Sequence, residues 1–235
     1  MRFDKKEAYL DLLQSGTGIF LALFIMGHLV FEASILISNE MMYKVTLMFE
    51  GFYLFGERHA WIISVLAGIV LVVFITHALI ALRRFPADYK RYKIIKHHTK
   101  SFAHEDTTLW SVQVATGFMM FFLGSVHLVM MISTPDKIGP FLSSYRVVHE
   151  YMWVVYFLLL LSVVTHAFIG LYRVMLKWGI FESDDPKTYR KLLKSAMRGF
   201  IVLYLFLGLA SLAKYSYIGM THNYEKTKIY KEVTQ

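Results

Sequence analysis

Long runs of hydrophobic residues, separated by short polar segments, dominate this chain. A run of about 20 apolar residues can cross the ~30 Å hydrocarbon core of a bilayer as a helix that rises ~1.5 Å per residue. Five such runs are present, and each predicts a transmembrane helix: residues 16–37, 60–82, 110–132, 147–176 and 199–213. No internal repeat, linker or low-complexity segment is evident between them. The pattern predicts an all-α integral membrane protein, a bundle of five transmembrane helices that forms a single domain over residues 1–235.

Composition agrees with the hydrophobic pattern. The chain is 56% hydrophobic, whereas soluble domains contain about 45–50% apolar residues. It has no cysteine, which excludes disulfides, thiolate-bound zinc and iron–sulfur clusters held by this chain alone. The net charge of +8 lies in short loops between apolar runs. This distribution is typical of a membrane protein and argues against nucleic-acid binding.

The basic residues predict the orientation of the chain. Three of the 25 precede the first run, seven lie between residues 83 and 100, and seven lie between residues 173 and 198. These three segments fall on one side of the membrane, and the eight remaining basic residues fall on the other. Because the side richer in lysine and arginine faces the cytoplasm, we expect a cytoplasmic N-terminus and a C-terminus outside.

Four of the ten histidines lie inside predicted spans, one on each of the first four helices: His28, His77, His127 and His166. A single membrane histidine can be structural, but an ionisable residue in a span is costly and suggests a function. Neutral imidazole is a good ligand for haem iron, and two histidines on one iron leave no open coordination site. Four such residues therefore favour two b haems that transfer electrons.

The depth of each histidine suggests how they pair. His77 and His166 lie ~9 and ~10 Å from the cytoplasmic ends of their helices, from the rise per residue. His28 and His127 lie ~18 and ~26 Å from that side by the same rule. We therefore expect one haem near the cytoplasm, between His77 and His166, and a second nearer the outside, between His28 and His127. Glycine and alanine residues flank each histidine and leave room for a macrocycle, although small residues also allow close helix packing.

Several segments resemble a known family. The resemblance covers roughly residues 10 to 180 and keeps the spacing of the four histidines; it is carried by 14–18 (QSGTG), 26–28 (MGH), 76–78 (THA), 106–110 (DTTLW), 117–118 (GF), 121–127 (FFLGSVH), 170–173 (GLYR) and 177–179 (KWG). These resemble the di-haem cytochrome b subunit of menaquinol:fumarate reductases. This subunit is the single-chain, five-helix membrane anchor of the succinate dehydrogenase/fumarate reductase superfamily.

The resemblance implies roles for particular residues. The four axial haem ligands of the family fall on His28, His77, His127 and His166, with the same pairing as the depth argument. Its haem-propionate contacts fall on six residues, of which Ser143 and Arg146 belong to the outer haem: Gln14, Ser15, Trp110, Lys177, Ser143 and Arg146. Its quinol-oxidising glutamate falls on Glu50, in the outer loop after the first helix. Simpler roles stay open, because lysine and arginine also occur as interfacial charges, tryptophan in the aromatic belt and glutamate in solvated loops.

The implied enzyme is a complex in the bacterial cytoplasmic membrane. A flavoprotein subunit and an iron–sulfur subunit would dock on the cytoplasmic face, and two such heterotrimers could associate as a dimer. This chain would oxidise menaquinol near the outer haem and pass electrons inward, and would carry out no dicarboxylate chemistry itself. The cofactors, two b haems, supply the redox chemistry, and the protein positions them.

One position departs from the family pattern. A glutamate two residues before the fourth ligand is proposed to carry protons across the membrane in family members, and this chain has Val164 there. Glu32 also lies in the membrane, one turn after His28, and either a proton-transfer role or an interfacial role fits it. The direction of the reaction stays open, because relatives oxidise succinate with menaquinone on the same architecture.

Two other classes of protein share some of these features. A cytochrome b anchor of a hydrogenase or formate dehydrogenase would hold the same haems but bind different soluble partners. A metal-ion transporter with intramembrane histidines would bind a divalent metal and no haem. The spans hold few of the acidic residues that usually accompany histidine at such transport sites, so the transporter is the least favoured of the three.

Overall fold

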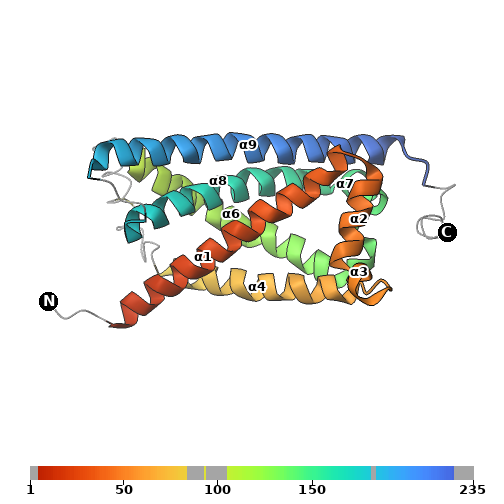
Figure 1. Cartoon of the computed structure of the whole chain (residues 1–235), viewed down its shortest axis with the longest axis horizontal. Coiled ribbons are helices and arrows are strands. Elements are labelled where there is room, and N and C mark those ends of the chain that lie inside the picture. Colours follow the sequence, from red (N-terminus) through yellow and green to blue (C-terminus); the bar gives the residue numbers. More distant parts are fainter. Residues whose placement is uncertain (1–4, 84–92, 94–104, 181–183, 225–235) are drawn as a thin grey trace.

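Five long, apolar helices form the body of the protein (Figure 1). The computed structural model describes residues 5–83, 93, 105–180 and 184–224. The long helices are α1 (Lys5–Glu32), α4 (Trp61–Leu82), α6 (Glu105–Ser133), α8 (Met152–Trp178) and α9 (Pro186–Thr221). Each is long and apolar enough to cross a membrane. The predicted fold class, an all-α bundle of five membrane helices, is therefore confirmed.

Five short helices lie together at one end of the bundle (Figure 1). They are η1 (Ala33–Leu36), α2 (Asn39–Phe49), α3 (Phe52–Phe55), η2 (Pro135–Lys137) and α7 (Pro140–His149). We call this end, where α1 finishes and α4 begins, the apical end, and the opposite end, where α1 begins and α4 finishes, the basal end. The N-terminus lies toward the basal end and the C-terminus toward the apical end, as an odd number of spans requires.

The helix bounds differ from the predicted spans where polar residues continue a helix. α9 starts at Pro186, 13 residues before the expected range 199–213, and its 36 residues extend ~54 Å at 1.5 Å per residue. The Asp185 carboxylate begins this helix by accepting hydrogen bonds from the backbone N–H groups of Lys187 (3.0 Å) and Thr188 (3.3 Å). The side chain of Thr188 and these amides hold the pKa of the Asp185 carboxyl below its usual value. Hydrophobicity alone could not find this polar first part of the helix.

The expected span 147–176 is interrupted near its start. α7 ends at His149 and α8 begins at Met152. Between them Tyr151 has φ of +56°, a left-handed conformation that ends the helical hydrogen-bond pattern. The His149 ring then lies against α9, with Nε2 3.1 Å from the Gly219 carbonyl oxygen. The fourth long helix is therefore shorter than its apolar run.

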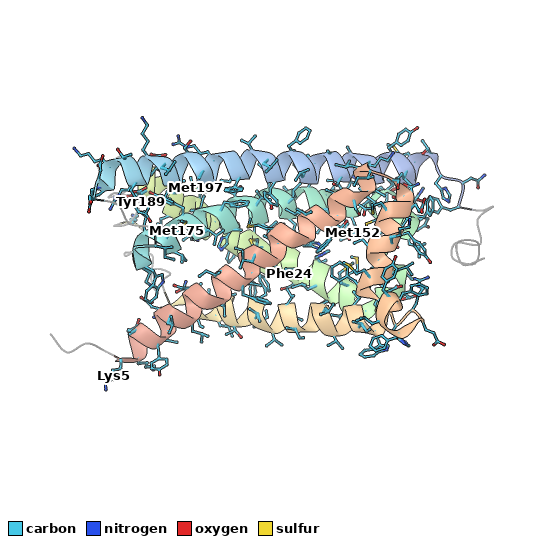
Figure 2. The ribbon with its side chains drawn as sticks, viewed as in Figure 1. Lys5, Phe24, Met152, Met175, Tyr189 and Met197 are labelled. Carbon is cyan, nitrogen blue, oxygen red and sulfur yellow. The ribbon has the colours of Figure 1, made fainter. Side chains whose placement is uncertain are left out.

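Many of the buried apolar side chains form two groups. The first joins α1, α8 and α9 and includes Leu29, Val164, Phe168 and Met197, the last labelled at the basal part of α9 in Figure 2. The second lies at the apical end, where Ile35, Met42, Val147, Tyr215 and Ile218 pack together. Large apolar side chains elsewhere on the long helices point outward, as lipid contact requires: Phe20, Leu23, Val72, Phe122, Val202 and Phe206.

Ion pairs connect the helices at the basal end. Lys194 on α9 lies 2.9 Å from Glu105 and 2.8 Å from Asp106, both at the start of α6. Lys177 near the end of α8 pairs with Asp11 on α1 at 2.8 Å. Arg83, which follows α4, also pairs with Asp11. Each of the five long helices thus takes part in an ion pair at this end, in one group of α6 and α9 and another of α1, α4 and α8.

The close contact between α7 and α9 predicts a test of the fold. A Cβ atom on Gly219 would lie 2.5 Å from the backbone oxygen of Ser144, which cannot move as a side chain could. We expect Gly219→Ala to destabilise the protein by about 1–3 kcal/mol, the usual cost of overpacking. The measurement is the apparent thermal midpoint in detergent. Gly199→Ala is the matched control, because no atom lies within 4 Å of a Cβ at Gly199 on the same helix. Equal midpoints for the two variants would contradict this packing.

Candidate functional site

Two histidine pairs lie inside the bundle. The rings of His77 on α4 and His166 on α8 have centroids 6.4 Å apart, and the rings of His28 on α1 and His127 on α6 have centroids 6.3 Å apart. Each pair therefore joins two helices. The pairs that the structure brings together are those suggested by depth.

Both pairs have the separation of two imidazoles on one metal. A metal–imidazole nitrogen bond is about 2 Å long, so two rings on opposite sides of one metal have centres about 6 Å apart. Along α1, Thr17 contacts the His77 ring and His28 follows 11 residues later, so the two sites lie ~16 Å apart along this helix. No group of three or more His, Asp or Glu side chains that could hold a metal ion occurs among the residues described, and a bis-histidine haem needs only two.

Hydrogen bonds fix the rings of the basal pair. The Nδ1 atom of His77 lies 3.0 Å from the Thr17 hydroxyl oxygen, and that hydroxyl donates to the Leu13 carbonyl at 2.7 Å. Because the hydroxyl proton is used in that bond, the Thr17 oxygen accepts a hydrogen bond from Nδ1–H of His77. On the other side, Nδ1 of His166 lies 2.9 Å from the Gln113 carbonyl. These partners assign the proton to Nδ1 in each ring and leave Nε2 free to bind a metal.

Two glycines make room beside the basal pair. A Cβ on Gly18 of α1 would lie 3.0 Å from Cε1 of His77, and one on Gly117 of α6 would lie 2.9 Å from Cε1 of His166. Any larger residue at these positions would displace a ring. The two glycines therefore allow the histidine rings to lie close against the neighbouring helices.

The apical pair borders a large cavity. The cavity has a volume of about 540 Å³, and both His28 and His127 line it. Phe24, labelled near the middle of α1 in Figure 2, stacks on the His28 ring with centroids 5.6 Å apart. Nδ1 of His127 is buried and has no hydrogen-bond partner among the described residues. An apolar cavity of this size, bordered by two imidazoles, fits a planar macrocycle.

The predicted propionate contacts fall into two groups that match the two pairs. Ser143 and Arg146 line the apical cavity. Arg146 is only 4% exposed, so a buried cation faces this cavity. Trp110 and Lys177 line a second cavity of about 460 Å³ at the basal end.

Gln14 and Ser15 lie at the same basal end. The Gln14 side-chain oxygen accepts from Arg83 at 3.4 Å. The Ser15 hydroxyl accepts from the indole N–H of Trp178 at 3.0 Å and donates to the Asp11 carbonyl. Asp11 also pairs with Lys177. Four of the six predicted contacts thus lie at the basal end, and the two assigned to the outer haem line the same cavity as the apical pair.

Glu50 lies in a different environment from the solvated loop that the sequence suggested as its alternative. It follows α2, is fully buried and forms two hydrogen bonds with Arg58, from Nε to Oε2 at 2.5 Å and from Nη2 to Oε1 at 3.0 Å. Its neighbours Thr46 and Phe49 line the apical cavity. Glu50 is therefore a buried, paired carboxylate beside that cavity.

Comparison with known proteins identifies the family. A profile of the succinate dehydrogenase/fumarate reductase transmembrane subunit matches residues 89–209. The fumarate reductase cytochrome b subunit of Helicobacter pylori strain J99 is 42% identical over 228 residues, which cover 97% of this chain and 88% of the relative. That of Wolinella succinogenes is 44% identical over 214 residues, which cover 90% and 82%.

The chain belongs to the succinate dehydrogenase/fumarate reductase transmembrane subunit family. The resemblance identified from the sequence motifs is confirmed. As a member of this family with five apolar helices, it is a multi-pass protein of a bacterial membrane.

The sequence carries a short repeat that our first interpretation missed. Gln14, Thr17, Gly18 and His28 recur with identical spacing, 99 residues later, as Gln113, Thr116, Gly117 and His127. The tripeptide Thr-His-Ala also occurs twice, at 76–78 and 165–167. The expectation of no internal repeat was therefore wrong. The repeat would have identified Thr17, Gln113 and Thr116 as partners of the histidines, because each threonine stands opposite a histidine of the basal pair.

Proposed function

We propose that this chain is the cytochrome b membrane anchor of a fumarate reductase complex. In this proposal it oxidises menaquinol near the apical end and passes electrons through two bis-histidine b haems to an iron–sulfur subunit. The observation that carries the proposal is the pair of facing histidines at each of two depths, with ring centroids 6.3 and 6.4 Å apart. The names of the relatives support the same enzyme class.

The residues around each pair have separate tasks. When bound, the haems would supply the one-electron chemistry. Thr17 and the Gln113 carbonyl hold the basal imidazoles through Nδ1, so that Nε2 of each would be free to bind the haem iron. Cationic and polar side chains at the two ends would bind the propionates, with Lys177 and Trp110 at the basal site and Arg146 and Ser143 at the apical site.

The basal end would face the cytoplasm. The segments richest in basic residues connect or precede the helices at this end, which agrees with the positive-inside rule. The iron–sulfur and flavoprotein subunits would dock here, next to the basal histidine pair. In this orientation α2, α3 and α7 lie on the outer side, beside the cavity of His28 and His127.

Glu50 would accept a proton during quinol oxidation at the apical end. Its burial places a carboxylate beside an apolar cavity, where it pairs with Arg58. Proton transfer requires it to move from Arg58 toward the cavity, past Thr46 and Phe49.

Val164 cannot carry a proton across the membrane to balance the charge of the transferred electrons. Its side chain is fully buried between Leu160 and Phe168 and carries no exchangeable proton. If no other path carries a proton across the membrane, protons from menaquinol would be released outside while fumarate reduction consumes protons inside, and turnover would be electrogenic. The fumarate reductase names of the relatives favour this direction over succinate oxidation.

The histidine pairing predicts selective loss of one haem. Each of His77→Ala and His166→Ala should lower the haem content from two to one per chain, because each removes a ligand of the same iron. Pyridine-haemochrome quantitation of the purified complex measures this. His59→Ala is the control, since this histidine lies outside the pairs, next to Phe55 and Trp61. Retention of both haems in either basal variant would contradict the pairing.

Removal of the Thr17 hydroxyl should disturb one haem only. Thr17→Val takes away an acceptor for Nδ1–H of His77, which lowers the basicity of the imidazole and weakens metal binding by about 10- to 100-fold. We expect the midpoint potential of one haem to rise while that of the other stays unchanged in a redox titration. Thr76→Val is the matched control, because its hydroxyl donates to the Val72 carbonyl of its own helix at 2.8 Å. Identical titrations of Thr17→Val and the wild type would exclude this role.

Replacement of the Glu50 carboxylate should block quinol oxidation. Glu50→Gln keeps the shape of the side chain but cannot accept a proton as a carboxylate does, so quinol-dependent fumarate reduction should fall at least about 100-fold. Fumarate reduction by a reduced viologen dye, which bypasses the quinol site, should continue at the wild-type rate. Glu57→Gln, in the same loop and exposed, should retain both activities. An unchanged quinol rate would remove Glu50 from the mechanism.

A further inference from the structure

Glu32 is the one carboxylate that lines the apical cavity, among the residues that the structure describes. It is the last residue of α1 and lies one helical turn beyond His28. It is half-buried. A carboxylate in this apolar setting carries a desolvation cost and indicates a functional site.

Glu32 accepts a hydrogen bond from a tyrosine in a distant part of the chain. Tyr215 on α9 donates its hydroxyl to Oε2 of Glu32 at 2.9 Å, and Tyr215 is only 5% exposed. Tyr215 lines the same cavity. The tyrosine fixes one carboxylate oxygen, and Oε1 accepts no hydrogen bond from any other described residue. Glu32 is therefore oriented at the cavity wall with an oxygen available to a ligand.

Glu50 differs from Glu32 in the hydrogen bonding of its oxygens and in its position relative to the cavity. Both oxygens of Glu50 are held by Arg58, and the side chain is not among the described residues that line the cavity. A ligand in the cavity would meet Glu32 without any rearrangement. It would meet Glu50 only after the ion pair with Arg58 had opened.

We propose that Glu32, held by Tyr215, is a second quinol-binding carboxylate that accepts a proton from one quinol hydroxyl. This inference rests on the proposed function, because it needs a quinol at the border of the apical cavity, beside the haem that His28 and His127 would hold. Oxidation of one quinol releases two electrons and two protons. A haem bound between His28 and His127 would supply the acceptor for these electrons. As the quinol O–H bond breaks and its carbon–oxygen bond becomes a carbonyl, one proton goes to Oε1 of Glu32 and the other to Glu50.

The test uses the purified holocomplex with Glu32→Gln, Glu32→Asp and Tyr215→Phe. Three quantities are measured for each variant: haem content, fumarate reduction by reduced viologen dye, and the kcat and KM for fumarate reduction by reduced 2,3-dimethyl-1,4-naphthoquinone. Glu40→Gln is the control, because Glu40 is an exposed carboxylate on α2 at the same end of the bundle and pairs only with Lys44 among the described residues.

We expect Glu32→Gln to lower the quinol kcat about 100-fold, the range of a lost proton acceptor, with KM changed less than threefold. Glu32→Asp should restore part of this rate, and Tyr215→Phe should lower it about three- to tenfold. Haem content and dye-dependent activity should stay at the wild-type level in all three.

Two results would overturn the assignment of Glu32. One is a quinol kcat within twofold of the wild type in Glu32→Gln with both haems present. The other is loss of a haem in Glu32→Gln, which would make Glu32 a structural part of the cavity. If the wild type and Glu40→Gln themselves fail to oxidise the quinol, the proposed function fails, and Glu32 loses its substrate for that separate reason.

Discussion

The arrangement of the long helices depends on two pairs of facing imidazole rings inside the membrane. A polar ring in hydrocarbon needs a partner, because lipid offers none. Here His77 on α4 faces His166 on α8, and His28 on α1 faces His127 on α6, with ring centroids 6.4 and 6.3 Å apart. The basal rings lie close against α1 and α6, which requires glycine at Gly18 and Gly117. Each pair therefore places two helices at a matching depth.

The two halves of the bundle then differ in polarity. At the basal end ion pairs such as Lys177–Asp11 join the helices, and the imidazoles donate to fixed acceptors. At the apical end a largely apolar cavity holds a few polar groups, among them Arg146, Glu32 and Tyr215. The basal half is suited to holding a cofactor rigidly beside soluble partners. The apical half has room for a cofactor and a small hydrophobic substrate at its border.

Much of this could be predicted from the sequence because lipid imposes simple rules. Apolar length predicts the five helices, and the distance of each histidine from the basic loops predicts the pairs. The rules fail where local chemistry decides: the left-handed Tyr151 interrupts an apolar run, and polar residues after Pro186 extend α9. The partners of buried charges could not be predicted either. Arg58 reaches Glu50 because of the path of the loop between them, and a loop has no hydrophobic periodicity from which to predict it. The pair of Glu32 and Tyr215 joins residues 183 positions apart.

The central claim is that each chain holds two b haems between its four membrane histidines. The most direct test is a reduced-minus-oxidised difference spectrum of the purified complex, with the haem content counted against the amount of this chain. Two low-spin b haems per chain are the result that the two histidine pairs predict. One haem or none would mean that at least one pair holds the helices together without a cofactor.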